Sequence, residues 1–273
     1  MVKVKLYSRY DTKEILETRS AIEKHFAGEL EFVEQNPELV IVIGGDGAIL
    51  AAIAQYRDPE TVFLGINRGT VGFLASVDKH HDFIEVIESY LAGKLGVSKR
   101  VLVSAEVNRD GEMIYQADAL NEVVISSPLS VVDLKIAVDG MKYMRLSGTG
   151  VLISTATGST AYNLSAHGPI LTPQVSGLIV TELLDHSVPT PSLVVGHEQS
   201  IKVKIGRFKR QGQLKLSNGY PADVVLDADG SSLFSLAESD EVKLSKSDRK
   251  IQFVEYDQYD FFARLHNKLR IKQ

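Results

Sequence analysis

The chain has 273 residues and a mass of 30.0 kDa, which is long for one compact hydrophobic core and comfortable for two. Hydrophobic residues make up 44% and charged residues 24%, ordinary shares for a globular protein that exclude a disordered chain, a collagen and a coiled-coil rod. The net charge of −5 argues against a phosphate-driven nucleic-acid binder, and the absence of cysteine excludes disulfides, zinc–thiolate sites, iron–sulfur clusters and cysteine nucleophiles.

Three further observations concern location and metal binding. No apolar run approaches the roughly 18–20 residues that a membrane helix needs. The first residues already alternate as a β-strand would, so we expect no secretory signal, and the lack of cysteine fits a cytoplasmic protein. The 7 histidines form no two-histidine helical motif, since His80 and His81 are adjacent and the others are scattered. We therefore expect no metal cage built by the protein, which leaves open a metal that arrives on a substrate phosphate.

The first hundred residues alternate between strand and helix patterns. Strands are expected at residues 2–6, 30–33, 39–43 and 62–66, and helices at 12–27, 48–54 and 82–91. The apolar run Leu39–Ile43 is continuous and mostly β-branched, which is typical of a strand buried on both faces of a parallel sheet. Residues 1–99 are therefore predicted to form an N-terminal α/β domain with a mostly parallel sheet.

From about residue 100 the pattern changes to strands and tight turns. Strands are expected at residues 101–107, 112–116, 131–138, 141–146, 201–205, 213–216, 223–226 and 241–244. Asp139-Gly140 predicts a two-residue hairpin turn, because both positions of such a turn require positive φ. We place the domain boundary at this change of pattern and expect residues 100–255 to form a C-terminal, β-rich domain that resembles a β-sandwich.

The end of the chain is a separate segment. Residues 256–269 carry four aromatic side chains, followed by basic ones. We interpret residues 256–273 as a closing helical tail that packs back on the N-terminal domain, with its cations near the helix C-terminus favoured by the helix dipole. A patch that binds nucleic acid or a membrane is the alternative.

The first motif that carries chemistry is Gly44-Gly45-Asp46-Gly47. It lies between a buried strand and a helix, where ligands bind in open α/β sheets. Glycine backbone can approach phosphate oxygens, and a helix start offers N–H groups to an anion, so Gly44, Gly45 and Gly47 are predicted to bind phosphate. Asp46 would repel phosphate unless its carboxylate takes a proton from a hydroxyl or holds a cation. A plain strand-to-helix turn is the alternative.

The second motif is the segment Ser154–Pro169, which follows the strand pattern Val151–Ile153. It is dense in hydroxyl and amide side chains, and Tyr162 adds one ring that can stack on a base or sugar. The alternative is a capped helix start, which needs only one or two such residues. The density of polar side chains therefore favours a ligand-binding loop.

The third motif is the pair Asn121-Glu122, just before the strand pattern Val123–Ile125. Glu122 can accept hydrogen bonds from a ribose diol, and Asn121 can pair with an amide or a base edge. Two polar residues at the entrance of a strand are usually solvated, so the pair alone is a weak signal.

Taken together and in this order, the motifs resemble those of the NAD kinases. The resemblance also includes Gly65-Ile66-Asn67 and Gly72-Phe73-Leu74; it runs from about residue 39 to 171, with a similar tail over residues 257–269. Gly-Gly-Asp-Gly alone is shared with the related diacylglycerol-type lipid kinases and with phosphofructokinases. The run Thr157–Tyr162 narrows the resemblance to NAD kinase.

The resemblance implies an enzyme with an α/β domain and a β-rich domain. It implies transfer of the γ-phosphate of ATP, or in some members of polyphosphate, to the 2′-hydroxyl of the adenosine ribose of NAD, with a divalent cation such as Mg²⁺. Asp46 is the implied general base. The implied NAD-binding residues are Asp46, Gly47, Phe73, Asn121, Glu122, Thr149, Thr157, Thr160, Ala161, Tyr162, Asn163 and Ser165. The expected partners are NAD and ATP, without nucleic acid or membrane, in a homodimer or homotetramer.

The chain departs from the family pattern at three positions. Thr149 stands where many members have an aspartate that contacts the dinucleotide. Ser147 stands where an arginine is common, and Ala156 where many members have proline. We interpret these changes as adjustments of the NAD pocket that leave phosphoryl transfer intact.

Two other functions stay open from the sequence. A lipid kinase on the same scaffold would need a wide apolar slot in the β-rich domain, and no exposed aliphatic cluster demands one. A non-catalytic nucleotide sensor is conceivable because of Thr149 and Ser147, while the intact Asp46 argues against it. Phosphoryl transfer asks a protein mainly to position groups and to stabilise charge, so an ionised aspartate suffices as base.

Overall fold

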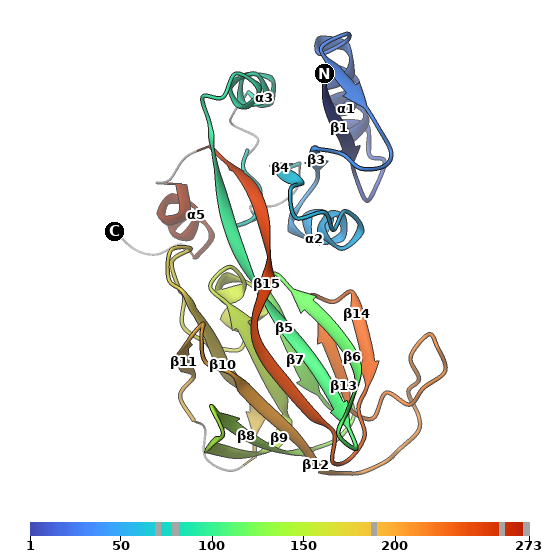
Figure 1. Ribbon diagram of the computed structural model, residues 1–273, viewed down its shortest axis with the longest axis vertical. Helices are drawn as coiled ribbons and strands as arrows, with labels where there is room; N and C mark the ends of the chain where they lie inside the picture. Colours follow the sequence, from blue (N-terminus) through green and yellow to red (C-terminus); the bar gives the residue numbers. More distant parts are fainter. Residues whose placement is uncertain (69–71, 78–81, 187–189, 257–259, 270–273) are drawn as a thin grey trace. The chain divides into compact units, whose positions relative to one another are not determined.

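The computed structural model describes residues 1–68, 72–77, 82–186, 190–256 and 260–269, and His80 and His81 lie outside these ranges. The chain divides into two compact units, one of Met1–Arg100 with Lys250–Gln273 and the other of Val101–Arg249. Figure 1 labels most of the helices and strands.

The first unit is built on a parallel sheet. Its strands are β1 (Val2–Tyr7), β2 (Leu30–Phe32), β3 (Leu39–Ile43), β4 (Val62–Ile66) and the end of β15 (Glu241–Glu255), in the order β2-β1-β3-β4-β15. Every residue of β3 and β4 is buried, because these two strands have neighbours on both edges and are covered on both faces. The predicted α/β architecture with a mostly parallel sheet is confirmed.

Three helices of this unit each come after one of the parallel strands. They are α1 (Lys13–His25), α2 (Asp46–Gln55) and α3 (Phe83–Leu91). The side chain of Thr12 caps α1, and the carboxylate of Asp82 caps α3 by accepting the N–H of Ile84 at 2.9 Å. α2 starts at Asp46, two residues earlier than expected, so that Asp46 and Gly47 belong to its first turn.

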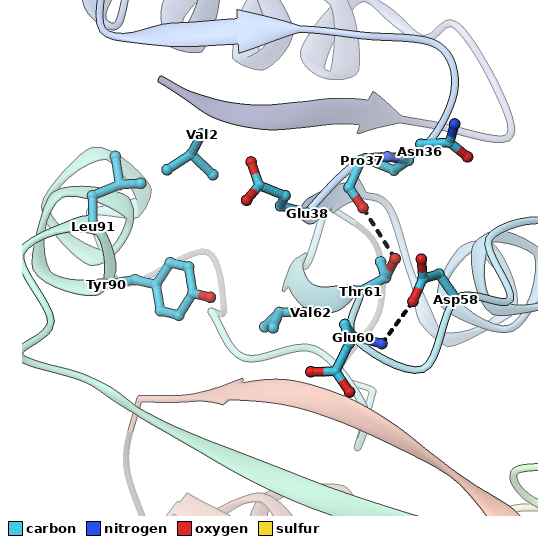
Figure 2. Close-up of a pocket in the computed structure, with 10 residues that line it drawn as sticks. All are labelled: Val2, Asn36, Pro37, Glu38, Asp58, Glu60, Thr61, Val62, Tyr90 and Leu91. Carbon is cyan, nitrogen blue, oxygen red and sulfur yellow. Dashed lines mark hydrogen bonds between the residues drawn. The ribbon is translucent and has the colours of Figure 1, made fainter.

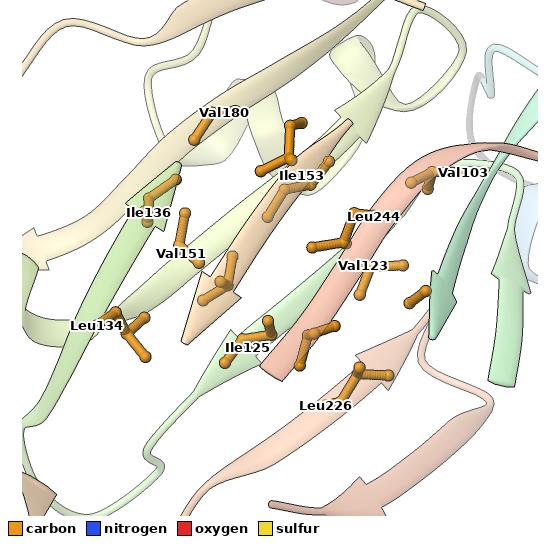
Figure 3. Packing of buried hydrophobic residues seen from close by; sticks show 14 of the residues in the cluster. Val103, Val123, Ile125, Leu134, Ile136, Val151, Ile153, Val180, Leu226 and Leu244 are labelled. Atoms are coloured by element: carbon orange, nitrogen blue, oxygen red, sulfur yellow. The ribbon is translucent and has the colours of Figure 1, made fainter. Parts of the chain in front are cut away.

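The second unit is made of antiparallel strands. They are β5 (Gly96–Arg109), β6 (Glu112–Ala119), β7 (Glu122–Ser126), β8 (Val132–Val138), β9 (Met141–Thr155), β10 (Gly177–Asp185), β11 (Leu193–Gly196), β12 (Ile201–Phe208), β13 (Val225–Ala228), β14 (Ser232–Ser235) and the first part of β15. One hydrophobic core receives buried side chains from most of them, among them Val123, Ile153 and Leu244 (Figure 3). The predicted β-rich, sandwich-like architecture is confirmed.

One predicted turn is found in the structure, and one predicted strand is not. Asp139 and Gly140 join β8 to β9 with φ of 47° and 77°, as predicted for a two-residue hairpin turn. The expected strand at 213–216 is wrong, since only Lys215 forms an isolated bridge, to Pro221. Leu214 stays 42% exposed, so the alternating pattern there has no buried face to stabilise a strand.

The tail returns to the first unit, as predicted. Helix α5 spans Asp260–Leu269, and Tyr256, where the expected helical tail begins, lies after the end of β15 and outside a helix. The parts of the expected tail at residues 257–259 and 270–273 lie outside the described ranges. The ring of Phe261 lies 6.1 Å from that of Phe73, centroid to centroid. Arg264 donates hydrogen bonds to backbone carbonyls of the same region, which are described below.

Candidate active site

The Gly-Gly-Asp-Gly motif forms the turn between β3 and α2. Gly44 is buried, and a Cβ added there would lie 2.9 Å from the Cβ of Ala48, closer than real Cβ atoms approach each other. Gly45 is the N-cap residue of α2, and no side chain caps the helix at this end. The first N–H groups of α2 therefore have no capping oxygen and point to where an anion can bind.

The carboxylate of Asp46 is held by backbone amides. Its Oδ2 accepts the N–H of Phe73 at 2.9 Å, and its Oδ1 accepts the N–H of Leu74 at 3.2 Å. Gly72 lies against the same carboxylate, so that a Cβ at residue 72 would collide with Oδ1. The two bonds fix the orientation of the carboxylate and leave each oxygen a lone pair for a further donor.

A cation lies beside this turn. Arg9 follows β1, and its Nη1 lies 3.9 Å from the place that a Cβ of Gly47 would occupy. Both residues are exposed. A guanidinium next to glycine N–H groups, beyond the carboxyl ends of β1 and β3, makes this edge of the sheet attractive for phosphate.

In the second unit, Asp229 holds the Asn121-Glu122 pair. Its carboxylate accepts the N–H groups of Leu120, Asn121 and Glu122 at 2.6, 2.9 and 3.1 Å. Asp229 has φ of 53° in the turn between β13 and β14, a conformation that aspartate tolerates better than most residues. The backbone at the start of β7 is thereby fixed from one side.

The polar segment that follows β9 fixes the same backbone from another side. The N–H of Thr155 donates to the carbonyl of Asn121 at 2.9 Å, and its hydroxyl donates to the carbonyl of Leu120 at 2.6 Å. Gly158 is packed against the Asn121 carbonyl so closely that a Cβ would collide with it. Asn121, Glu122 and the segment of residues 154–165 thus form one local cluster, which the sequence predicted as two separate motifs.

This cluster contains buried acceptors without a partner. Oδ1 of Asn121 and Oε2 of Glu122 accept no hydrogen bond from the residues that the structure describes, and Asn121 is 7% exposed. Burial, followed by the carboxylates of Asp229 and Asp227, raises the pKa of Glu122 from 4.5 to about 8, against a hydrogen bond from the backbone of Tyr162. Such groups are unfavourable unless a ligand supplies hydroxyl or N–H partners.

The remaining predicted residues of this segment differ in what their side chains can still bind. Asn163 is fully buried, its Nδ2 donates to the carbonyl of Pro169 at 3.0 Å, and its Oδ1 accepts from the hydroxyl of Thr181 at 2.8 Å. Thr160 is also buried, and its hydroxyl is 3.4 Å from the carbonyl of Thr157. The Asn163 amide therefore braces the loop from inside.

Other side chains of the segment are accessible. Tyr162 is 47% exposed, Ser165 is exposed, and Thr157 and Ala161 are half-buried. Tyr162 and Ser165 belong to the short helix α4 (Tyr162–Ser165), while Thr157 and Ala161 flank the 3₁₀ helix η1 (Gly158–Thr160). An accessible ring beside polar groups suits a base or a sugar.

Two of the positions that depart from the family pattern, Ser147 and Thr149, lie on β9, and the third, Ala156, directly follows it. Ser147 is exposed and donates from its hydroxyl to Asp133 at 2.8 Å. Thr149 is half-buried, and its carbonyl accepts the N–H of Ser127 at 2.8 Å. Nothing in these contacts replaces a carboxylate at position 149.

A cavity of about 420 Å³ opens at the opposite edge of the parallel sheet from Asp46 (Figure 2). It lies at the amino ends of the strands, where β1 begins at Val2 and β4 at Val62. Glu38, Asp58 and Glu60 line it, and a wall with these carboxylates is unfavourable for nucleotide phosphates. The candidate sites are therefore the residues around Asp46 in the first unit and, separately, those around Glu122 in the second.

Comparison with protein families decides the identity. Residues 2–95 match the sequence model of the ATP-NAD kinase N-terminal domain, and residues 120–256 match that of the ATP-NAD kinase C-terminal domain. The chain belongs to the NAD kinase family. The resemblance seen in the motifs is thereby confirmed, and the protein is a kinase, an enzyme of the transferase class.

Individual NAD kinases are similar over most of their length. The NAD kinase of Acidobacterium capsulatum is 35% identical over 238 residues, which are 86% of this chain and 79% of that protein. The NAD kinase of Lachnospira eligens is 33% identical over 244 residues, 88% of this chain and 83% of that protein.

Two solved structures show the same fold. Yeast NADH kinase, complexed with NADH, has a TM-score of 0.87 and 20% identity and covers 100% of this chain and 88% of its own. An NAD kinase from Archaeoglobus fulgidus, in complex with ATP, has a TM-score of 0.78 and 22% identity and covers 98% of each chain.

The sequence alone does not reveal the contacts of four residues in this member of the NAD kinase family. Arg9 and Asp229 belong to no motif, Arg264 lies in the tail to which the sequence assigned no role in the site, and only the fold brings each of them to motif residues. Gly72 belongs to a motif, but its contact with Asp46 becomes visible only in the fold. In the described ranges, no helix is long and apolar enough to cross a membrane, and no group of three or more His, Asp or Glu residues could hold a metal ion.

The contact between Gly72 and Asp46 generates a prediction. Gly72→Ala should lower kcat about tenfold or more with ATP and NAD, because the added methyl displaces the carboxylate and small misplacements of reacting groups cost large rate factors. Steady-state kinetics together with the melting temperature measure this. The control is Gly96→Ala, at an exposed position where a Cβ meets nothing within 4 Å, and it should leave kcat unchanged. Equal kcat values for the two variants would contradict the expectation.

The raised pKa of Glu122 generates a second prediction, on stability against pH. In the native state Glu122 keeps its proton up to about pH 8, whereas the unfolded chain loses it near 4.5, so its contribution to stability is lost progressively between these values. Glu122→Gln removes this loss. The melting temperature of the variant relative to wild type should rise by about 2 °C or more from pH 5 to pH 8 and then level off.

The matched control for this titration is Glu112→Gln, at an exposed carboxylate of β6. Its melting temperature relative to wild type should change little over the same range. If the difference in melting temperature between Glu122→Gln and wild type is the same at all pH values, Glu122 does not titrate between pH 5 and pH 8.

Proposed function

We propose that this protein transfers the γ-phosphate of ATP to the 2′-hydroxyl of the adenosine ribose of NAD, giving NADP, with Asp46 as the general base. The observation that carries the proposal is the carboxylate of Asp46, fixed by the amides of Phe73 and Leu74 within a glycine turn suited to phosphate. A carboxylate in such a place is unfavourable for anion binding alone. It is useful if it takes the proton of an attacking hydroxyl.

In this mechanism the first unit handles the phosphates. The backbone N–H groups at Gly45 and Gly47 would stabilise the charge of the transferred phosphoryl group, and Arg9 would draw the triphosphate to the turn. Gly44, whose N–H donates to the carbonyl of Ile66 at 2.9 Å, would let phosphate oxygens approach through its lack of a side chain. Phosphoryl transfer needs the hydroxyl and the γ-phosphate in line, and little covalent help from the protein. A base fixed in orientation meets that demand.

The second unit would hold NAD. Glu122 is largely protonated at neutral pH, since its pKa is about 8, so it offers both a donor and an acceptor to a ribose diol, and Asn121 offers a buried acceptor. Tyr162 would stack on the ligand, with Asn163 bracing the loop from inside. The full proposed NAD-binding set comprises Asp46, Gly47, Phe73, Asn121, Glu122, Thr149, Thr157, Thr160, Ala161, Tyr162, Asn163 and Ser165. The NADH and ATP complexes of the two structural relatives support these two nucleotides as ligands.

Further parts of the proposal rest on the family resemblance. A divalent cation, Mg²⁺, would accompany ATP and neutralise charge between its phosphates. The protein would act in the cytoplasm as a homodimer or homotetramer. Residues 1–99, with 256–273, and residues 100–255 would be its domains.

The test is Asp46→Asn, which keeps the size and much of the hydrogen bonding of the side chain but cannot take a proton. We expect a folded protein that binds NAD and whose kcat is lowered about 10²–10⁴-fold, the usual cost of losing a general base. An NADP-dependent dehydrogenase reads the product, because it accepts only the 2′-phosphorylated dinucleotide. Asp11→Asn, at an exposed aspartate, is the matched control and should keep wild-type kcat.

The general-base role is wrong if Asp46→Asn keeps more than roughly a tenth of wild-type kcat, a smaller loss than such a role allows. Wild-type protein that phosphorylates diacylglycerol in place of NAD would point to a lipid kinase. Wild-type protein that binds NAD without forming NADP would point to a sensor.

A further inference from the structure

The segment Gly72–Ala75 bonds on one side to Asp46 and on another to the tail helix α5. Arg264 of α5 donates from Nη1 to the carbonyl of Ala75 at 2.5 Å and to the carbonyl of Phe73 at 3.3 Å. A guanidinium is always charged, and hydrogen bonds from a charged donor are stronger than those between neutral groups. Arg264 is half-buried, which reduces the screening of these bonds by water.

One peptide group of this segment bonds to both residues. The carbonyl of Phe73 and the N–H of Leu74 belong to the same peptide plane; the first accepts from Arg264 and the second donates to Asp46. Because the peptide group is planar and rigid, a rotation that breaks one of these bonds also strains the other. The cation on the carbonyl oxygen also polarises the peptide, which strengthens its N–H as a donor to the carboxylate.

Other contacts join the segment to the C-terminal part of the chain. The ring of Phe73 packs on that of Phe261, one turn before Arg264 in α5. Just beyond the segment, the hydroxyl of Ser76 donates to the carbonyl of Val254 in β15 at 2.8 Å. The segment that orients Asp46 is thus supported by residues about 180 positions later in the chain.

We propose that Arg264 is a positioning residue for phosphoryl transfer, which holds the Phe73–Leu74 peptide in the orientation that aims the Asp46 carboxylate. Helix α5 then helps to orient a catalytic side chain, in addition to packing on the first unit. The inference rests on the proposed role of Asp46 as base.

A double-mutant cycle tests the proposal in the full-length protein. Arg264→Met keeps most of the aliphatic stem and removes the donors, and it should lower kcat about tenfold or more, with KM for NAD and ATP changed less than about threefold. In the Asp46→Asn background the same substitution should change the residual kcat less than about twofold, because its target is already lost. Arg264→Lys keeps a charged donor group, so its kcat should lie between those of Arg264→Met and wild type.

The matched control is Arg57→Met. Arg57 also lies in the first unit and donates from Nε to a backbone carbonyl, that of Ala54 at 2.9 Å, but it lies outside the proposed site. The kcat of Arg57→Met should equal that of wild type. Kinetics per folded molecule, with melting temperatures for all variants, separate loss of positioning from loss of folded protein.

The outcomes separate the two proposals. If Arg264→Met lowers kcat by the same factor in both backgrounds, or leaves wild-type kcat unchanged, Arg264 does not act through Asp46 and the inference is overturned while the base role stands. If Asp46→Asn itself retains high activity, the base role fails and the inference fails with it. A loss in the wild-type background that disappears in the Asp46→Asn background supports both.

Discussion

The structure depends on a carboxylate that is satisfied by backbone amides. Asp46 would be repelled by the phosphates that the glycine turn between β3 and α2 suits, and it keeps its place because the amides of Phe73 and Leu74 bind it. Those amides are available only because Gly72 leaves room for the carboxylate. The need to hold one negative charge beside a turn that suits phosphate thus explains why residue 72 is glycine and why residues 73 and 74 present their amides to Asp46.

In the second unit, too, backbone amides donate to a carboxylate, but there the carboxylate fixes the backbone around it. The carboxylate of Asp229 gathers three consecutive amides at residues 120–122, which sets the start of β7 against the polar segment after β9. The result is a cluster in which Asn121 and Glu122 each have a buried oxygen without a partner among the described residues, and burial raises the pKa of Glu122 to about 8. The carboxylate of Asp46 is therefore fixed by amides in the orientation that its proposed role as base requires, whereas that of Asp229 fixes a surface whose buried polar atoms a ligand could satisfy.

Much of this was predictable from the sequence, where local pattern and local chemistry coincide. The buried run of β3, the turn at Asp139-Gly140 and the motifs of the family all depend on neighbours in the chain. Strands β10, β11 and β14 were not predicted, because short apolar or mixed runs do not distinguish strand from helix or loop. Asp229 and Arg264 were invisible for a different reason: their partners lie more than 100 positions away, and only the completed fold joins them.

The most direct measurement is of the amide protons of Phe73 and Leu74 by ¹H–¹⁵N NMR, in the wild-type protein and in Asp46→Ala. If the carboxylate of Asp46 is held by these amides, the substitution should shift both resonances upfield and speed their exchange with solvent, while amides in the β8–β9 hairpin stay unchanged. Phe73 and Leu74 amides with unaltered shifts and exchange rates would contradict it. The carboxylate of Asp46 would then not be bonded to these amides, and the roles inferred for Gly72 and Arg264 in orienting it would be wrong.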